Sequence, residues 1–147
     1  MARQRFNKLF SAEEANQLLP KLHLLIRELQ AQANALRERI RELARADDRL
    51  CRLDLPEVLE RYPELAPLAA RMSELATEIE STGCLLKDID LGLVDFPFEI
   101  GEDGDGESEI GFLCWQYGEP TIAAWHPIDE GFAGRRPLPG ASKVYLN

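Results

Sequence analysis

One apolar stripe at helical spacing, in the first third of the chain, constrains the fold more than any other feature. Its leucine and isoleucine residues follow one another at alternating steps of four and three, with one place missing. The members are Leu18, Leu22, Leu25, Leu29, Leu36, Ile40 and Leu43. This pattern is typical of a long helix that packs along one edge in coiled-coil fashion. An apolar edge of that length has to be covered, so we expect a second helix beside it.

The start of the helix is marked as well. Ser11 and Glu14 form a capping-box pattern, in which each side chain can accept a hydrogen bond from an unpaired backbone N–H at a helix start. We therefore expect a helix from Ser11 to about Arg45, about 50 Å long at 1.5 Å per residue. Pro20 lies inside this range and should kink the first turns, because it removes one helical hydrogen bond.

A second stripe with the same spacing follows later. Its members are Leu65, Leu68, Met72, Leu75 and Ile79. Between the stripes, Pro56 and Pro63 indicate a turn with one short helix at 56–61. The two stripes predict an antiparallel helical hairpin over 11–80. Its second helix is about half as long as the first, so the overhang needs cover from the turn segment 50–59 or from a second subunit. We expect a homodimer, because two-fold dimers are the commonest oligomers.

The pattern changes to the two-residue period of a strand at Val94, Phe96, Phe98 and Ile100, and Pro97 predicts an edge strand. The segments IGFLCWQ and TIAAWH then indicate a hairpin closed by Gly118-Glu119. A two-residue turn pairs Trp115 with Ile122 and Leu113 with Ala124, so that Phe112, Cys114, Ala123 and Trp125 share the other face. Both faces would then be apolar, and the tail residues Pro137, Leu138, Val144, Tyr145 and Leu146 are available to cover the second one.

These patterns predict an α+β fold. We expect one domain over 1–147, in which a long antiparallel coiled-coil-like helical hairpin (11–80) precedes a small antiparallel three-stranded β-meander. The meander belongs to an acidic β-unit with a C-terminal tail (81–147). Residues 1–80 carry 13 Lys and Arg against 14 Asp and Glu, whereas residues 81–147 carry 4 against 12. An acidic unit disfavours nucleic acid and favours a cation or a basic protein surface as its partner.

No apolar run approaches the length of a membrane helix, and no signal-peptide pattern opens the sequence, so we expect a cytoplasmic protein that does not enter a membrane. The three cysteines are odd in number and form no C-x-x-C pair. They predict three free thiols, with Cys114 as a small buried apolar residue rather than a reactive one. The acidic loop around Asp103 and Asp105 lacks the glycine and the bidentate glutamate of an EF-hand, so a solvated loop is the simpler interpretation.

Polar residues that can carry chemistry gather at strand ends and turns of the β-unit. His126 can serve as a metal ligand or a general base, with nearby carboxylates as partners for a divalent metal ion. The candidate metal ligands are Asp90, Asp95, Glu119 and His126, and the candidate catalytic residues are Lys87, Asp88, His126 and Arg135. In the two-residue-turn hairpin, however, Glu119 lies at the opposite end from His126. Structural hydrogen bonds and ion pairs are the alternative use of all these side chains.

Two stretches of the chain resemble a known family. The phrases LKD, GLVDF, LCW, GE and WH, followed by G and R, and the opening FSAEEANQLLPKL are similar to the prokaryotic family catalogued as domain of unknown function 2203. The resemblance covers most of the chain and implies no reaction. It places the following residues at motif positions: Lys87, Asp88, Asp95, Trp115, Glu119, His126 and Arg135.

Three functions follow as hypotheses. The first is a non-enzymatic interaction or scaffold protein that acts as a homodimer. The second is a metal-assisted or acid–base enzyme that uses His126 and nearby carboxylates. The third is a protein that binds an anion or a nucleotide through Lys87, Arg135 and Arg136.

Overall fold

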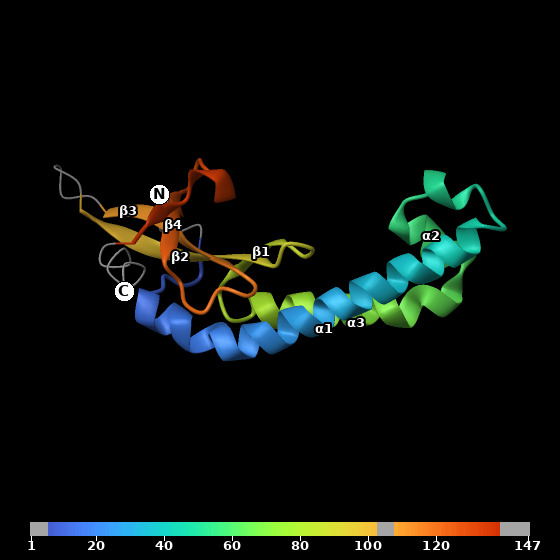
Figure 1. Cartoon of the computed structure of the whole chain (residues 1–147), viewed down its shortest axis with the longest axis horizontal. Coiled ribbons are helices and arrows are strands. Elements are labelled where there is room, and N and C mark those ends of the chain that lie inside the picture. Colours follow the sequence, from blue (N-terminus) through green and yellow to red (C-terminus); the bar gives the residue numbers. More distant parts are fainter. Residues whose placement is uncertain (1–5, 103–107, 139–147) are drawn as a thin grey trace.

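The chain is elongated, with a β-sheet at one end and a pair of helices that extends away from it (Figure 1). The computed structural model describes residues 6–102 and 108–138. Helix α1 (Ala12–Ala44) and helix α3 (Ala66–Glu80) lie side by side and run antiparallel. A turn segment joins them at the far end, formed by η2 (Leu50–Arg52), α2 (Leu55–Arg61) and η3 (Pro63–Leu65). The α+β prediction is confirmed.

The predicted capping box opens α1. The Ser11 hydroxyl accepts a hydrogen bond from the Glu14 N–H at 3.1 Å, and the Glu14 carboxylate accepts one from the Ser11 N–H at 3.0 Å. The buried edge of α1 differs in part from the predicted stripe, since it runs through Ala15, Leu19, Leu22, Ile26, Leu29, Ala33 and Leu36. Leu18 and Leu25 flank this edge and are only partly buried. The stretch is apolar over more than one edge, so spacing alone did not select the buried one. Coiled-coil geometry for the helix pair stays a prediction.

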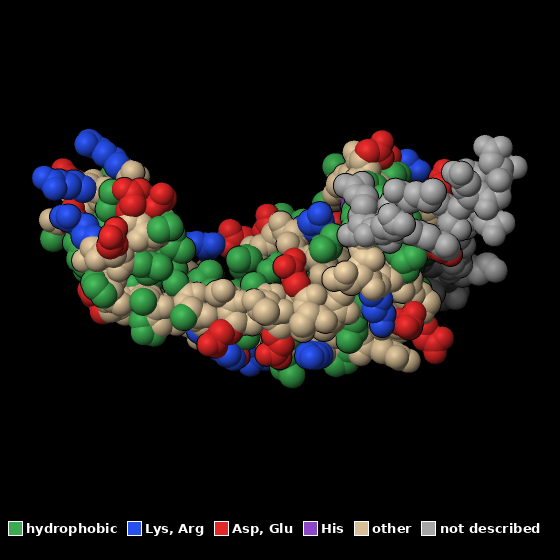
Figure 2. Space-filling view, turned by 180° about the vertical axis from the view of Figure 1, so that it is seen from behind, with side chains coloured by type: hydrophobic (Ala, Val, Ile, Leu, Met, Phe, Trp, Pro, Cys, Tyr) green, Lys and Arg blue, Asp and Glu red, His purple; other side chains and the backbone are tan. Residues whose placement is uncertain are grey.

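The two helices are joined by a core and by one ion pair. Leu22, Ile26 and Leu29 of α1 share a buried cluster with Leu75 and Ile79 of α3. At its edge, the Arg71 guanidinium donates two hydrogen bonds to the Glu28 carboxylate, at 2.7 and 3.0 Å. These bonds lower the pKa of Glu28. On the face of the helix pair seen in Figure 2, Lys and Arg side chains are mixed with Asp and Glu side chains.

The turn segment covers the overhang of α1. Leu50, Val58 and Leu65 are buried together with Leu36 in a second cluster, and Ile40 and Leu43 pack against it. The predicted short helix at 56–61 is confirmed by α2, which adds one residue at its start. A second subunit is therefore not needed to cover this stripe. The overhang therefore gives no reason to expect a homodimer, and the homodimer itself stays a prediction.

A polar contact fastens the turn segment to itself. The Asp47 side chain, only 9% exposed, accepts hydrogen bonds from the Tyr62 hydroxyl at 2.7 Å and from Nε of Arg61 at 2.5 Å. The Arg49 N–H donates a third one. These three donors favour the charged carboxylate and lower its pKa below the ordinary value of 3.8. The stabilisation that they provide is therefore present above about pH 4 and is lost as the pH falls through the lowered pKa.

We predict that Asp47→Asn makes the protein less stable at pH 7 and less sensitive to acid. The amide cannot carry the charge that the three donors favour, so part of the acid-dependent loss disappears. Urea unfolding followed by circular dichroism at pH 7 and pH 3 measures both effects. Asp48→Asn, on the exposed neighbouring residue, is the matched control. Equal losses between the two pH values in Asp47→Asn and in the unaltered protein would contradict the prediction.

Over the residues that the structure describes, the sheet has five antiparallel strands in the order β1-β2-β3-β4-β5, and not the predicted three. The strands are β1 (Leu85–Asp88), β2 (Leu93–Glu102), β3 (Ser108–Gln116), β4 (Ala124–Pro127) and β5 (Arg136–Pro137). Strands β1 and β5 are too short to show an alternating pattern. The prediction that the Pro97 strand is an edge strand is also wrong, because β2 lies between β1 and β3. Pro97 itself lies beyond the part of β2 that pairs with β1, and its carbonyl accepts the Phe10 N–H at 2.7 Å.

The predicted register of the β3–β4 hairpin is wrong by one residue. Leu113 pairs with Trp125 and Cys114 with Ala124, whereas the prediction paired Leu113 with Ala124. The turn is closed by the Glu119 N–H on the Gln116 carbonyl, with Gly118 at a φ of 102°, and four further residues lead from it to β4. A shift of one residue moves every side chain of a strand to the other face. Trp125 therefore lies on the helix-facing side, and His126 on the opposite side.

The two faces of the sheet have different characters. Val94, Phe96, Leu113 and Trp115 face the helices and complete the main buried cluster. The opposite face is covered in part by Phe6, whose ring lies edge-on to Phe112 at 5.5 Å. The predicted cover from Val144, Tyr145 and Leu146 lies outside the described residues, as does the loop at 103–107. Within the described part of the chain, no helix is both long and apolar enough to cross a membrane.

Candidate metal centre

Three side chains that commonly bind metals meet on the sheet face that points away from the helices. Asp95 comes from β2, Cys114 lies directly opposite it on β3, and His126 lies on β4 two residues beyond the partner of Cys114. All three are buried. One donor atom from each lies within 4.8 Å of the other two. Three adjacent strands therefore bring a carboxylate, a thiol and an imidazole together.

The His126 ring is held in one orientation. Its Nδ1 lies 2.9 Å from the Pro127 carbonyl oxygen, and its Nε2 lies 3.1 Å from Oδ2 of Asp95. A carbonyl oxygen can only accept a hydrogen bond, so Nδ1 carries a proton and donates it. Nε2 therefore faces the Asp95 carboxylate, to which it can donate a hydrogen bond when it carries a proton; without that proton, its lone pair is available to a cation. Ligand histidines in metalloproteins are oriented in the same way, by a backbone carbonyl on the other ring nitrogen.

The Cys114 thiol keeps its proton at neutral pH. Burial raises its pKa to about 12, and the negative charge of Asp95 contributes in the same direction, whereas Arg135 opposes the shift. The thiol is therefore not a nucleophile by itself. A bound cation would change this, because metals bind the thiolate and displace the proton.

The three donors open into a cavity of about 160 Å³. Its other walls are mostly apolar and are formed by Leu93, Phe112, Ile128 and Phe132. Lys87 lies at the same cavity, with its ammonium 5.3 Å from the centre of the Phe112 ring. A ligand in this cavity would therefore contact the donor atoms on one side and apolar walls on the others.

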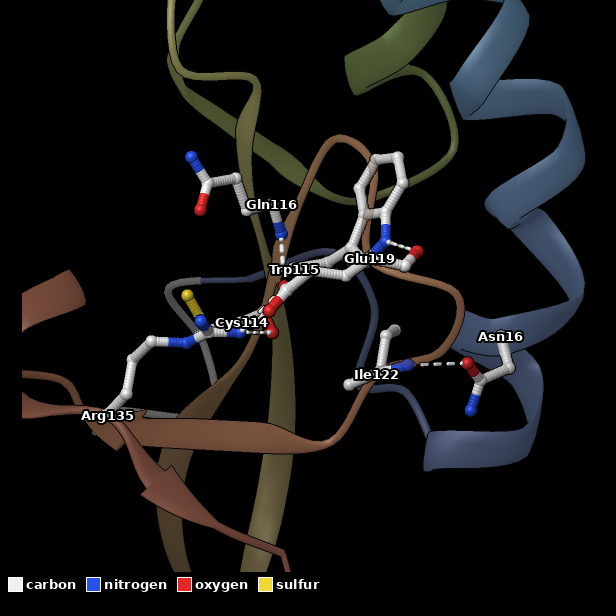
Figure 3. A network of polar contacts seen from close by, with 7 residues as sticks. All are labelled: Asn16, Cys114, Trp115, Gln116, Glu119, Ile122 and Arg135. Atoms are coloured by element: carbon white, nitrogen blue, oxygen red, sulfur yellow. Dashed lines mark hydrogen bonds and ion pairs between the residues drawn. The ribbon is translucent and has the colours of Figure 1, made fainter. Parts of the chain in front are cut away.

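A second polar network holds the connection between β3 and β4 (Figure 3). Nη2 of Arg135 donates to both oxygens of Glu119, at 2.7 and 3.0 Å, and to the Cys114 carbonyl at 3.2 Å. The Glu119 carboxylate also accepts the Gln116 N–H at 2.7 Å. The Glu119 carbonyl accepts the indole N–H of Trp115 at 2.9 Å. This network ties the turn to the strand that carries Cys114.

The far end of the same connection is anchored to α1. The Ile122 N–H donates to the Asn16 side chain at 2.8 Å, 106 residues away in the sequence (Figure 3). Since both ends of the connection are held, the entry of β4 into the sheet is fixed. This fixes the register that places His126, rather than Trp125, beside Asp95.

The structure brings together only part of the predicted site. Of the four candidate metal ligands, Asp95 and His126 meet, whereas Glu119 pairs with Arg135. Asp90 forms an ion pair with Arg37 of α1, away from the cluster. The other carboxylate proposed as a His126 partner, Asp88, accepts the Leu91 N–H at 2.8 Å in the turn after β1.

The residues predicted to bind an anion do not form one cluster. Lys87 lies at the cavity, Arg135 binds Glu119, and Arg136 binds Glu130 at 2.9 Å while its guanidinium lies over the Trp125 ring. Cys114 is the member of the site that sequence reasoning missed. Its burial was predicted correctly, but the register that puts it between Asp95 and His126 was not.

We predict that one of the three thiols reacts rapidly with Ellman's reagent in the native protein and that all three react after unfolding. Cys51 is exposed, whereas Cys84 and Cys114 are buried and burial raises the pKa of both. Absorbance after mixing counts the reacting thiols, and mass spectrometry of the labelled peptides identifies them. Labelling of Cys114 as fast as that of Cys51 would show that the site is open to solvent.

Comparison with known proteins adds a family to this geometry. Residues 8–138 match the family model described as an uncharacterised conserved protein, domain of unknown function 2203. No match was found among curated proteins or among solved structures. The match includes every strand and helix described above and confirms the resemblance in the sequence. The chain therefore belongs to the family of domain of unknown function 2203.

Proposed function

We propose that this protein binds one divalent transition-metal ion, with zinc as the best fit, through Asp95, Cys114 and His126, and uses it to act on a small molecule in the adjacent cavity. The observation that carries the proposal is the hydrogen bond from Nδ1 of His126 to the Pro127 carbonyl. It leaves Nε2 facing the Asp95 carboxylate with the Cys114 thiol nearby, so that its lone pair is available to a cation bound between the three side chains.

The donor set suits zinc. Zinc binds thiolate, imidazole and carboxylate at about 2.0–2.3 Å, and in a tetrahedral site the donors are about 3.3–3.8 Å apart. The donor atoms here lie within 4.8 Å of one another without an ion, so small side-chain rotations suffice to close the site. One thiolate among the ligands also favours zinc over magnesium or calcium, which prefer oxygen donors alone.

The number of protein ligands favours catalysis over a structural role. Structural zinc sites use four protein ligands, whereas catalytic sites use three and leave one position for water or substrate. The fourth position here would face the cavity. A metal at such a site lowers the pKa of its bound water to about 7 and so supplies a nucleophile at neutral pH. Hydrolysis or hydration of a small substrate is the chemistry that this arrangement supports best.

The chain supplies the supporting contacts of such a site. The Pro127 carbonyl fixes the His126 ring, and Arg135 holds the backbone of Cys114. Partners of this kind orient metal ligands and typically change metal affinity by about 10- to 100-fold. All three proposed ligands belong to one chain, so the site does not depend on the predicted homodimer. The homodimer and the cytoplasmic location remain proposals.

We predict that the purified protein binds one zinc ion per chain and that Asp95→Asn and Cys114→Ser each lower the affinity by more than about 100-fold. Equilibrium dialysis followed by elemental analysis measures the stoichiometry. Cys84→Ser is the matched control, because Cys84 is also buried but lies outside the cluster. Circular dichroism of each variant checks that it folds. Equal zinc binding by Cys114→Ser and Cys84→Ser would overturn the proposed site.

Cobalt substitution gives a second test that does not depend on a folded variant. We predict that the cobalt-loaded protein shows thiolate-to-cobalt charge-transfer absorption, because Cys114 binds the ion directly. Added azide should then shift the visible cobalt bands, because it occupies the open position. Absence of the charge-transfer band would exclude Cys114 as a ligand. Cobalt bands that do not respond to azide would indicate a fourth protein ligand and contradict the catalytic part of the proposal.

A further inference from the structure

We propose that the ligand of this cavity is a small organic monocarboxylate and that the Lys87 ammonium binds its negative charge. The inference rests on the proposed metal site and adds the substrate or product class for it. Three observations support it. They are the charge of the cavity, the position of Lys87 and the size and character of the walls.

The charges around the proposed metal nearly cancel before Lys87 is considered. The dication is balanced by the Asp95 carboxylate and the Cys114 thiolate. Glu130, at the same cavity, forms an ion pair with Arg136 at 2.9 Å, and the nearby Glu119 is paired with Arg135. The cavity therefore gains one net positive charge from Lys87. A single positive charge favours a monoanion over a neutral ligand, a cation or a dianion.

Lys87 lies where it can meet such a ligand. It is exposed on β1, and its ammonium is 5.3 Å from the ring of Phe112, a wall of the cavity. Phe112 pairs with His126 across the sheet. The ring that the Lys87 ammonium contacts therefore belongs to the direct neighbour of a proposed metal ligand. Among the residues whose side chains the structure describes, 6–100 and 109–138, no carboxylate lies within ion-pair distance of Lys87. Its charge is thus available to a ligand at the mouth of the cavity.

The walls define the rest of the ligand. The cavity of about 160 Å³ is similar to the roughly 150 Å³ cavity that admits benzene in a well-studied apolar core, and it is smaller than the sites of drug-sized ligands. Leu93, Ile128 and Phe132 add apolar surface beside Phe112. A carboxylate with a short alkyl or aryl group, about six to nine non-hydrogen atoms in all, satisfies both the charge and the walls.

Butyrate and its uncharged counterpart butyramide are suitable probes, because they have nearly the same shape. We predict that the zinc-loaded protein binds butyrate at least about ten-fold more tightly than butyramide. Lys87→Met should lower the affinity for butyrate about ten-fold and leave the affinity for butyramide unchanged. Lys87→Arg should retain most of the affinity for butyrate. Isothermal titration calorimetry gives both affinities. Lys8→Met is the matched control, because Lys8 also lies over a phenylalanine ring, at 4.9 Å, but away from the cavity.

The outcomes separate this inference from the proposed function. Zinc content is measured first for each protein. If the unaltered protein binds no zinc at the three ligands, both the proposed metal site and this inference are excluded. One zinc per chain in both the unaltered protein and Lys87→Met, with equal affinity for butyrate and butyramide, overturns the inference and leaves the metal site in place. Loss of butyrate binding in Lys8→Met to the same extent as in Lys87→Met would also overturn it.

Discussion

The register of β4 against β3 is the constraint on which the rest of the structure depends. His126 can reach Asp95 and Cys114 only because it pairs with Phe112, and a shift of one residue would turn its ring toward the helices. The shift would also move Trp125, which now packs against the main core and lies edge-on to Phe98 at 6.0 Å, to the opposite face. A large aromatic ring contributes several kcal/mol through its burial. The folding energy of the core therefore selects the same register that assembles the candidate site.

Two polar side chains of α1 bind the turns of the sheet and so help to set this register. Asn16 holds the Ile122 N–H at the β3–β4 connection. Gln30, about four turns further along α1, donates to the Ile89 carbonyl at 2.9 Å in the turn between β1 and β2. Two turns of the sheet are thus attached to one helix. A continuous helix is stiff, so it fixes the two turns at a constant separation and limits sliding of the strands between them.

The parts of the fold that could be predicted are those in which the local pattern decides the structure. The capping box at Ser11, the short helix at 56–61 and the strands around Phe96 and Leu113 depend on neighbouring residues and were predicted correctly. The register of β4 depends instead on Asn16, which is 106 residues from its partner, so no local pattern contains it. Within the site, Asp95 and His126 were predicted as candidates. Cys114 was not, because its role depends on that register and its own surroundings in the sequence are apolar.

The surroundings of the three donors argue for a function beyond stability. A buried carboxylate and imidazole are costly to desolvate, and a core built only for stability would place apolar side chains there. The opposite face of the same strands does so, with Val94, Leu113 and Trp115 at the corresponding positions. The same strands thus carry an apolar layer on one face and the three donors, next to a cavity, on the other face. A bound cation would offset the cost, because it takes up the negative charges of the carboxylate and the thiolate and the lone pair of the imidazole in one interaction.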